Sequence, residues 1–127
     1  MRLFLAVAAI VILVGVSPSA ETARRRAPSR SMTMVATAYC LRGTTASGTQ
    51  VHRGTAAADP RVLPLGSRIP IRGRRIRGTY VVEDDGGAMK GRRLDIYMPS
   101  CDQAKRFGRQ RVTVTIESLG SPVRTTR

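Results

Sequence analysis

The segment EDDGGAMKGRRLDIY, residues 83–97, contains the pattern that decides the fold. It runs through a glycine-rich loop and ends in RLDIY, residues 93–97. Leu94 and Ile96 alternate with polar residues there, which predicts a short strand with one apolar face. Asp95 lies between them and points to the opposite face. Because aspartate is disfavoured in strands, we expect Asp95 either to face water or to have a function.

Similar alternation on both sides of this segment predicts five further short strands. They cover residues 32–40, 54–58, 68–72, 77–83 and 110–117. One short helix is expected over residues 101–107, with Ser100 or Asp102 as its N-cap and Gly108 at its end. Six short strands with little helix favour a closed barrel, because closure leaves no exposed strand edges. We therefore expect a mainly β fold, a six-stranded barrel with one short helix.

The two ends of the chain differ from this domain. Residues 3–16 form an apolar run shorter than the ~20 residues that cross a bilayer, and small residues follow it. Residues 1–20 are therefore predicted to be a signal peptide, with a short N-terminal anchor as the alternative. An Arg-, Pro- and Ser-rich linker (21–31), the folded domain (32–119) and a C-terminal tail (120–127) follow. We expect an exported protein, periplasmic or extracellular and associated with the cell wall.

The chain is strongly basic, with a net charge of +14, and 20 of its 22 basic residues are arginine. Such a balance indicates an anionic partner, unless it only reflects a genome that favours arginine codons. Nucleic acid is excluded by the expected export and by an aromatic content of 4%, since single-strand binders need aromatic stacking platforms. Anionic envelope polymers or phospholipid head groups remain as partners.

Two cysteines, Cys40 and Cys101, are present. An even count in an exported chain favours a disulfide, with free buried thiols as the alternative. His52 is the only histidine and is expected at the surface. Because no cysteine or histidine pair has metal-ligand spacing, we predict no metal and no cofactor.

Four aspartates deserve separate consideration: Asp59, Asp84, Asp85 and Asp95. Each has a structural alternative as a partner of the many arginines, and Asp59 also suits a turn before Pro60. Together they indicate more, because carboxylates that share a site raise one another's pKa. An acid that stays protonated near neutral pH is what cleavage of a glycosidic bond requires.

These residues resemble a known family. DPRVLPLGS (59–67) and EDDGGAMKGRRLDIY (83–97) are similar to the two signature segments of the three-aspartate, or 3D, domain family. TAYC (37–40), ASGTQV (46–51) and FGRQRVTVTI (107–116) fit it as well. The resemblance implies a double-psi β-barrel like the catalytic barrel of membrane-bound lytic transglycosylase A.

The resemblance also implies an activity and a set of roles. The family's aspartates map onto Asp59, Asp84 and Asp95. Asp95 is expected to act as the single acid and base that cleaves the MurNAc–GlcNAc bond of peptidoglycan and leaves 1,6-anhydromuramyl ends. Asp84 and Asp59 are expected to hold Asp95 in place and keep it protonated. Asp85 stands where the family usually has threonine, which adds a negative charge beside the site.

The remaining expected substrate contacts are Thr37, Tyr39, Gly86, Gly87, Lys90 and Tyr97. The glycines allow positive φ and close approach of a sugar to the backbone. Several of these residues also have a plain alternative: core packing for Tyr97, a simple turn for the glycines, and a solvated side chain for Lys90. Thr37 and Tyr39 are expected to line the floor of the groove.

Two other functions remain open at this point. One is an inverting glycoside hydrolase on the same barrel, in which a second aspartate activates water. The other is a non-catalytic module that binds the cell wall through its arginines. For an enzyme the expected partner is the peptidoglycan glycan strand, whereas the arginines of the binding module would hold anionic polymer. We expect a monomer.

Overall fold

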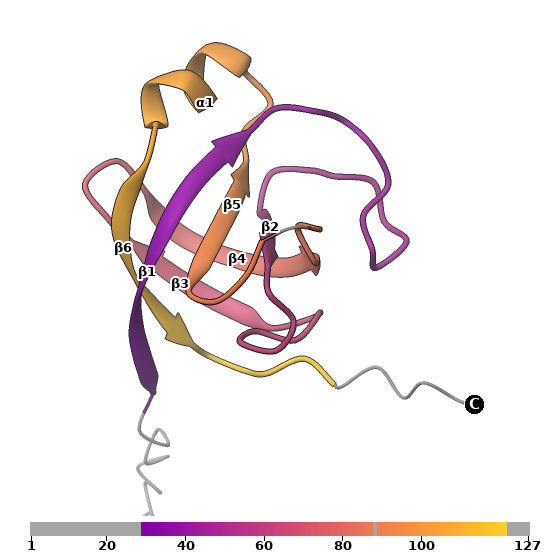
Figure 1. Ribbon diagram of the computed structural model, residues 1–127, viewed down its shortest axis with the longest axis vertical. Coiled ribbons are helices and arrows are strands. Elements are labelled where there is room, and N and C mark those ends of the chain that lie inside the picture. Colours follow the sequence, from indigo (N-terminus) through magenta and orange to yellow (C-terminus); the bar gives the residue numbers. More distant parts are fainter. Residues whose placement is uncertain (1–28, 88, 122–127) are drawn as a thin grey trace, which may run out of the picture.

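The computed structural model describes residues 29–87 and 89–121, drawn in colour in Figure 1. The predicted signal peptide, most of the linker and most of the tail lie outside these residues. The elements are β1 (Arg30–Tyr39), β2 (Thr55–Ala58), β3 (Arg68–Arg72), β4 (Arg77–Asp84), β5 (Arg93–Tyr97), α1 (Cys101–Phe107) and β6 (Gln110–Ile116). The prediction of a mainly β fold with one short helix is confirmed.

The six strands close into a barrel in the order β1-β5-β2-β4-β3-β6 (Figure 1). The pairs β1–β5 and β2–β4 are parallel, and the other four pairs are antiparallel. This mixed six-stranded barrel is consistent with the double-psi architecture that the resemblance implies. Closure also pairs every strand on both sides, so that none of these six strands presents a free edge.

The core fills the barrel with the inward residues of each strand. Fully buried side chains include Met34, Ile69, Val82, Leu94 and Val114. Burial of each such side chain contributes about 1.5–3 kcal/mol. In β2 the inward positions are both alanine, at Ala56 and Ala58, which leaves room for the larger side chains around them.

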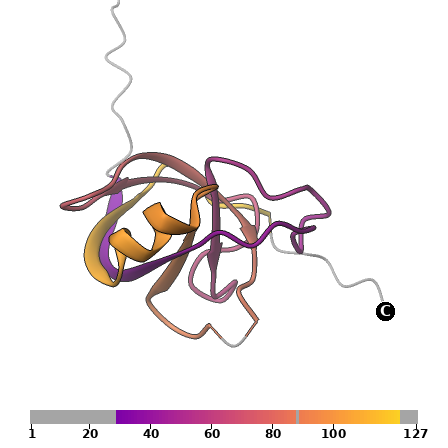
Figure 2. The ribbon, with the colours of Figure 1, turned by 90° about the horizontal axis from the view of Figure 1, so that it is seen from above.

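The helix α1 covers one end of the barrel, as Figure 2 shows from above. Ser100 caps it by accepting a hydrogen bond from the backbone N–H of Gln103, which decides between the two expected N-caps. Phe107 packs into the barrel core and Gly108 ends the helix. Within residues 29–87 and 89–121, no helix has the length and apolar character needed to cross a bilayer.

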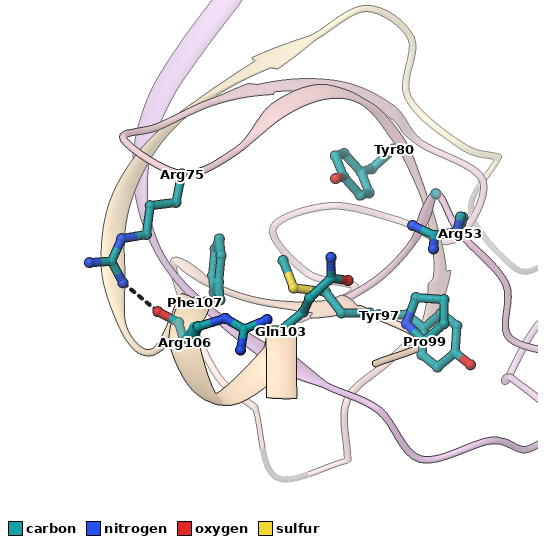
Figure 3. A pocket seen from close by; sticks show the side chains of 10 residues that line it. Arg53, Arg75, Tyr80, Tyr97, Pro99, Gln103, Arg106 and Phe107 are labelled. Carbon is teal, nitrogen blue, oxygen red and sulfur yellow. Dashed lines mark hydrogen bonds between the residues drawn. The ribbon is translucent and has the colours of Figure 1, made fainter. Parts of the chain in front are cut away.

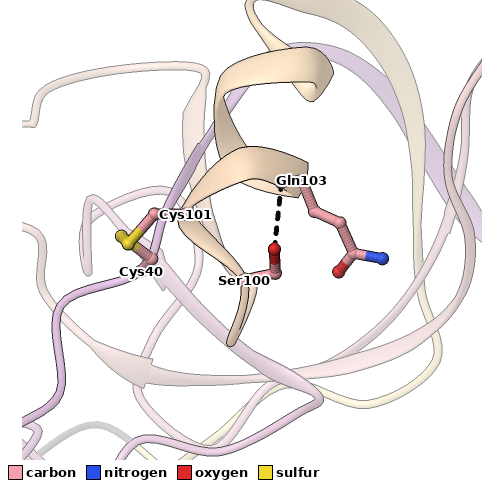
Figure 4. Close-up of a disulfide and its surroundings, with 4 residues drawn as sticks. All are labelled: Cys40, Ser100, Cys101 and Gln103. Carbon is pink, nitrogen blue, oxygen red and sulfur yellow. Dashed lines mark hydrogen bonds between the residues drawn. A yellow bond between two sulfur atoms is a disulfide. The ribbon is translucent and has the colours of Figure 1, made fainter.

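A disulfide joins the end of β1 to the start of α1 (Figure 4). The Cα atoms of Cys40 and Cys101 lie 5.1 Å apart, and 61 positions separate the two residues in sequence. The bridge is the arrangement that the even cysteine count favoured. It fixes the position of Tyr39, the last residue of β1, against the segment that follows β5.

The strand boundaries differ slightly from those expected. The strands β3 and β5 and the helix have the expected bounds, whereas β1 begins at Arg30, inside the expected linker. Arg30 pairs with Ile116, and the hydroxyls of Ser31 and Thr115 lie 3.1 Å apart. The pairing with β6 therefore extends β1 beyond the point at which its own apolar pattern stops.

Candidate active site

A row of four residues crosses neighbouring strands on the outer face of the barrel. Thr37 of β1 pairs with Asp95 of β5, Asp95 pairs with Ala57 of β2, and Ala57 pairs with Asp84 of β4. Ala57 lies outside the core cluster to which both of its sequence neighbours belong. Since strands are about 4.8 Å apart, the backbones of Asp95 and Asp84 are roughly 10 Å apart with a methyl group between them.

A β-bulge brings Asp84 into this row. Ala56 pairs with Val82, but the next residue, Ala57, pairs with Asp84, so that Glu83 is the extra residue in β4. A bulge of this kind turns the following side chain to a different face. Without it, Glu83 would stand opposite Ala57 and Asp84 would be displaced from the row.

Asp95 is half-buried, and its environment favours the protonated form. Burial raises the pKa of Asp95, while the hydrogen bond from Thr37 and the charge of Arg93 oppose this rise. The Thr37 hydroxyl lies 3.1 Å from Asp95 Oδ1 and 3.3 Å from the carbonyl oxygen of Leu94. Desolvation by burial is therefore the main cause, and no effect of a neighbouring carboxylate is needed.

Asp84 interacts with the loop that follows β1. Its Oδ1 accepts hydrogen bonds from the backbone N–H of Asp85 at 2.9 Å and of Ala46 at 3.3 Å. Next to it, the Ser47 hydroxyl donates to the carbonyl oxygen of Glu83 at 2.8 Å. These contacts fix the ASGTQV segment beside the outer end of the row.

Asp59 is placed differently from the other two aspartates. It directly follows β2, is 2% exposed, and pairs with Arg61 through Oδ1···Nε at 3.0 Å and Oδ2···Nη2 at 2.8 Å. The backbone N–H groups of Arg61 and Gly91 also donate to it. The hydrogen bond from the Arg61 side chain is the largest cause that holds the pKa of Asp59 well below its usual range.

The described contacts of Asp59 therefore reach Arg61 and the loop that leads into β5, and none joins it to Asp95. These surroundings match the structural alternative in which Asp59 pairs with an arginine and forms a turn at Pro60. Because Asp59 is held as an anion, it orders the Gly91 end of the loop from which β5 starts.

Tyr39 and Tyr97 lie next to each other at one end of the row. Their ring centroids are 5.5 Å apart in an edge-to-face arrangement. Burial, with the negative charges of Asp84 and Asp95 as further causes, raises the pKa of Tyr39 to about 12. Among the described residues, the Tyr39 hydroxyl is a buried polar atom without a hydrogen-bond partner. The hydrogen bond of this hydroxyl is therefore unmade in this structure, beside the aspartate row.

The other expected contacts surround the row. Gly86 and Gly87 both adopt positive φ, at 64° and 57°, as the glycine-rich loop requires. Lys90 is exposed in the same loop, and Asp85 accepts a hydrogen bond from the N–H of Gly87. His52 is exposed, as expected, and its Nε2 lies 3.1 Å from Glu83 Oε1.

Sequence reasoning missed Glu83 and Ala57. Glu83 accepts a 2.6 Å hydrogen bond from the Thr55 hydroxyl, which ties β4 to the start of β2 beside the bulge. Its position at the end of an apolar strand, directly before two aspartates, could have identified Glu83 as a site residue. No such indication exists for Ala57, because a small residue in a run of alanines is expected in the core. Among the described residues, no group of His, Cys, Asp or Glu is arranged to hold a metal ion.

Known proteins share this fold. The crystal structure of E. coli MltA with bound chitohexaose superposes with a TM-score of 0.50 and 21% identity, over 63% of this chain and 28% of that one. MltA is described as a lytic transglycosylase. At this identity the likeness concerns the fold alone.

Two Bacillus subtilis proteins are similar in sequence. One, named "Cell wall-binding protein YocH", is 34% identical over 69% of this chain and 33% of its own length. The other, named "Putative cell wall shaping protein YabE", is 30% identical over 80% of this chain and 26% of its own length. The chain thus spans a third or less of these relatives.

The family model of the 3D domain matches residues 54–119, which include Asp59, Asp84 and Asp95. The match covers 66 of the 127 residues, just over half of the chain. It spans five of the six strands and the helix, together with the bulge that brings Asp84 into the row. On this match the protein belongs to the 3D domain family.

Proposed function

We propose that this protein cleaves the MurNAc–GlcNAc bond of peptidoglycan as a lytic transglycosylase, with Asp95 as its acid and base. The observation that carries the proposal is the setting of Asp95. Its half-buried carboxyl faces away from the core, accepts a hydrogen bond from Thr37, and has a pKa raised by burial. A carboxyl that keeps its proton above the usual range is suited to protonate a leaving group.

In the first step, protonated Asp95 donates its proton to the glycosidic oxygen, and the bond from that oxygen to C1 of the muramyl residue breaks. The sugar then carries positive charge at C1 and the ring oxygen. Asp84, across Ala57 in the row, is positioned to stabilise this charge as a carboxylate.

In the second step, the Asp95 carboxylate takes the proton from the 6-hydroxyl of the same muramyl residue. The freed oxygen attacks C1 and closes the 1,6-anhydro ring. Asp95 is again protonated at the end, so the reaction consumes no water. One carboxyl therefore serves as acid and then as base.

The residues around the row supply substrate contacts in this proposal. A small rotation of the Tyr39 ring brings its hydroxyl, which is buried in this structure, to a sugar oxygen, and Tyr97 offers an aromatic edge beside it. Gly86 and Gly87 let the sugar approach the backbone, and Lys90 contacts an acidic group of the substrate. Asp59 acts indirectly by ordering the loop before β5.

We further propose that the protein is exported and works at the cell wall. A disulfide between Cys40 and Cys101 suits an oxidising compartment, and residues 1–20 are proposed as the signal that directs export. The names of the two Bacillus subtilis relatives support the location. The net charge of +14 adds attraction to anionic envelope polymers.

The test is mass spectrometry of the sugars released from purified sacculi. The proposal expects anhydromuramyl ends, one water lighter than hydrolysed ends. Reducing-end muramic acid would instead favour the inverting hydrolase, with Asp84 activating water.

A second candidate is a wall-binding module without catalysis, which the name of one relative and the charge favour. It expects no sugar release from any sacculus, together with binding that weakens steeply as salt screens the arginines. Binding by Asp95→Asn that equals wild-type binding, with no wild-type release, would make the module the better account.

A further inference from the structure

A cavity of about 670 Å³ lies at the end of the barrel that α1 covers. Its walls come from α1, from the turn between β3 and β4, and from the segment before β2. Figure 3 shows Arg75 and Arg106 on one side of it and Arg53 on the opposite side.

The cavity is positively charged. Three of its lining residues are arginines and none is acidic. Among the described salt bridges, none involves Arg53, Arg75 or Arg106. The Arg75 guanidinium donates to the backbone carbonyl oxygen of Arg106, which ties the Arg75 side chain to the end of α1 at one wall. The cavity therefore offers cationic groups to an anionic ligand.

The floor of the cavity is apolar. Phe107 belongs to the barrel core, and Tyr80 and Met98 pack against that core. Gln103 lines the cavity with a neutral amide, as Figure 3 shows. A ligand that combines carboxylates with methyl and methylene groups fits this lining. A polymer of glycerol phosphate would use the arginines and leave the apolar floor unoccupied.

The cavity adjoins the aspartate row through Tyr97. Tyr97 lines the cavity, and its ring also packs on Tyr39 beside the row. It lies two residues after Asp95 on the same strand. A group attached to a sugar at Asp95 therefore has the cavity directly beside it.

We propose that this cavity binds the carboxylate-bearing peptide stem of the glycan strand whose sugar lies at Asp95. The inference rests on the proposed function and deepens it, because each muramyl residue carries such an acidic peptide. The stem's carboxylates pair with Arg53 and Arg106, and its alanine methyl groups contact Tyr80, Met98 and Phe107. The cavity thereby selects glycan that retains its peptides.

The experiment measures the dissociation constants of labelled glycan strands, with peptide stems and after an amidase has removed them. An Asp95→Asn background stops turnover during the measurement. The proposal expects tighter binding of the strands that retain their stems. The ratio of the two constants reports the contribution of the stem, and general effects on strand binding cancel in it.

Two variants probe the cavity in different ways. Arg53→Gln with Arg106→Gln removes two charges but keeps the carbonyl that Arg75 uses. Because an exposed charge pair is worth about 1.5–5-fold in affinity, the stem preference should fall roughly 2–25-fold. Gln103→Glu keeps the side-chain shape and suits the third position of a Ser-capped helix, so the fold is retained. It should lower the preference by about 1.5–5-fold through repulsion.

Arg111→Gln is the matched control, since Arg111 is exposed on β6 and does not line this cavity. It should leave the preference unchanged. A preference that is absent in the wild type, or that falls as much in Arg111→Gln as in the cavity variants, would overturn the proposal. Cavity variants that instead lose binding to purified polyglycerol phosphate would assign the cavity to a phosphate polymer.

Failure of this inference is distinguishable from failure of the proposed function. Cleavage of both strand types at the same efficiency, with no effect of the cavity variants, leaves the transglycosylase standing and removes the stem site. A stem preference without any cleavage by the Asp95-containing protein supports the stem site and removes the catalytic proposal.

Discussion

The strand row around Asp95 and the loop around Asp59 shift the pKa of an aspartate in opposite directions. Asp95 is half-buried between the Thr37 hydroxyl and the methyl group of Ala57, and burial raises its pKa. Asp59 is buried more deeply, yet Arg61 and the Gly91 N–H hold its pKa below the usual range. The pKa values of these two aspartates of one family signature are therefore shifted in opposite directions, because their surroundings differ.

This difference agrees with the separate roles that the resemblance implies for them, Asp95 as the acid and base and Asp59 as a residue that helps to hold it in place. A carboxyl with a raised pKa can deliver a proton, whereas an arginine-paired carboxylate cannot do so near neutral pH. Asp59 instead orders the chain on either side of the site. In the proposed function Asp95 therefore transfers the proton and Asp59 has a structural role, and separate variants can test each role.

The largest effect is expected from Asp95→Asn. It keeps the shape of the side chain and removes the transferable proton, so activity on sacculi should fall by about 10²–10⁴-fold. Stability at pH 7 should not fall, because the change removes a partly buried charge whose ionisation burial disfavours. Product release and thermal melting together check both statements.

Asp85→Asn is the matched control for that variant. Asp85 is exposed, and its described hydrogen bond comes from the N–H of Gly87 in its own loop. Its loss should leave both activity and melting temperature close to the wild type. Full activity in a folded Asp95→Asn protein would remove Asp95 from the chemistry.

Removal of the disulfide by Cys40→Ser with Cys101→Ser should cost about 4 kcal/mol of stability, from the loop of some 60 residues that it closes. The end of β1, which carries Tyr39, should loosen most. The Gly91 amide, held by Asp59, should keep its protection. Amide hydrogen exchange checks this, and equal loss of protection at both places would show that the two regions are not independent.

Asp59→Asn should lower stability at neutral pH and make stability depend less on pH in the acidic range. Because the folded pKa of Asp59 is depressed, its stabilisation is present above the unfolded value near 3.8 and is lost as pH falls below it. The melting temperatures of variant and wild type should therefore differ most near pH 7 and approach each other towards pH 2.

Arg61→Gln is the companion of that variant, since it removes the partner and leaves the carboxyl. It should reproduce the loss at neutral pH. Asp95 has the opposite sign: with a raised folded pKa, its contribution falls as pH rises through the range above 3.8. A parallel pH dependence for Asp59→Asn and Asp95→Asn would contradict the comparison.

The smallest effect is expected from Tyr39→Phe. Its hydroxyl is buried without a described partner, so its loss should raise stability by up to about 1 kcal/mol. Activity should fall, because the sugar loses a hydrogen bond. Tyr80→Phe serves as the stability control, and a clear loss of stability in Tyr39→Phe would show that the hydroxyl already has a partner.

Much of the fold follows from the local sequence. Leu94 and Ile96 fixed the inward face of β5, and Ser100 and Gly108 delimited α1 through ordinary capping chemistry. The start of β1 did not follow, because Arg30 joins the strand only through its pairing with Ile116. Such an extension depends on a partner more than 80 residues away, which local periodicity cannot register.

The site follows less completely. The sequence pattern predicted the three aspartates. The bulge at Glu83 and the position of Ala57 between Asp95 and Asp84 depend on the register between strands, which the local sequence does not show. The cavity shows the same limit more strongly. Arg53, Arg75 and Arg106 are far apart in the chain and line one cavity only because the barrel closes.

The most direct test of the central claim is a titration of the side-chain carboxyl carbons by NMR in the wild-type protein. The account predicts that Asp95 titrates above the ordinary value of 3.8 and that Asp59 titrates below it. Arg61→Gln should shift Asp59 upward and leave Asp95 where it was. An Asp95 that titrates at or below 3.8 would contradict the assignment of Asp95 as the proton donor.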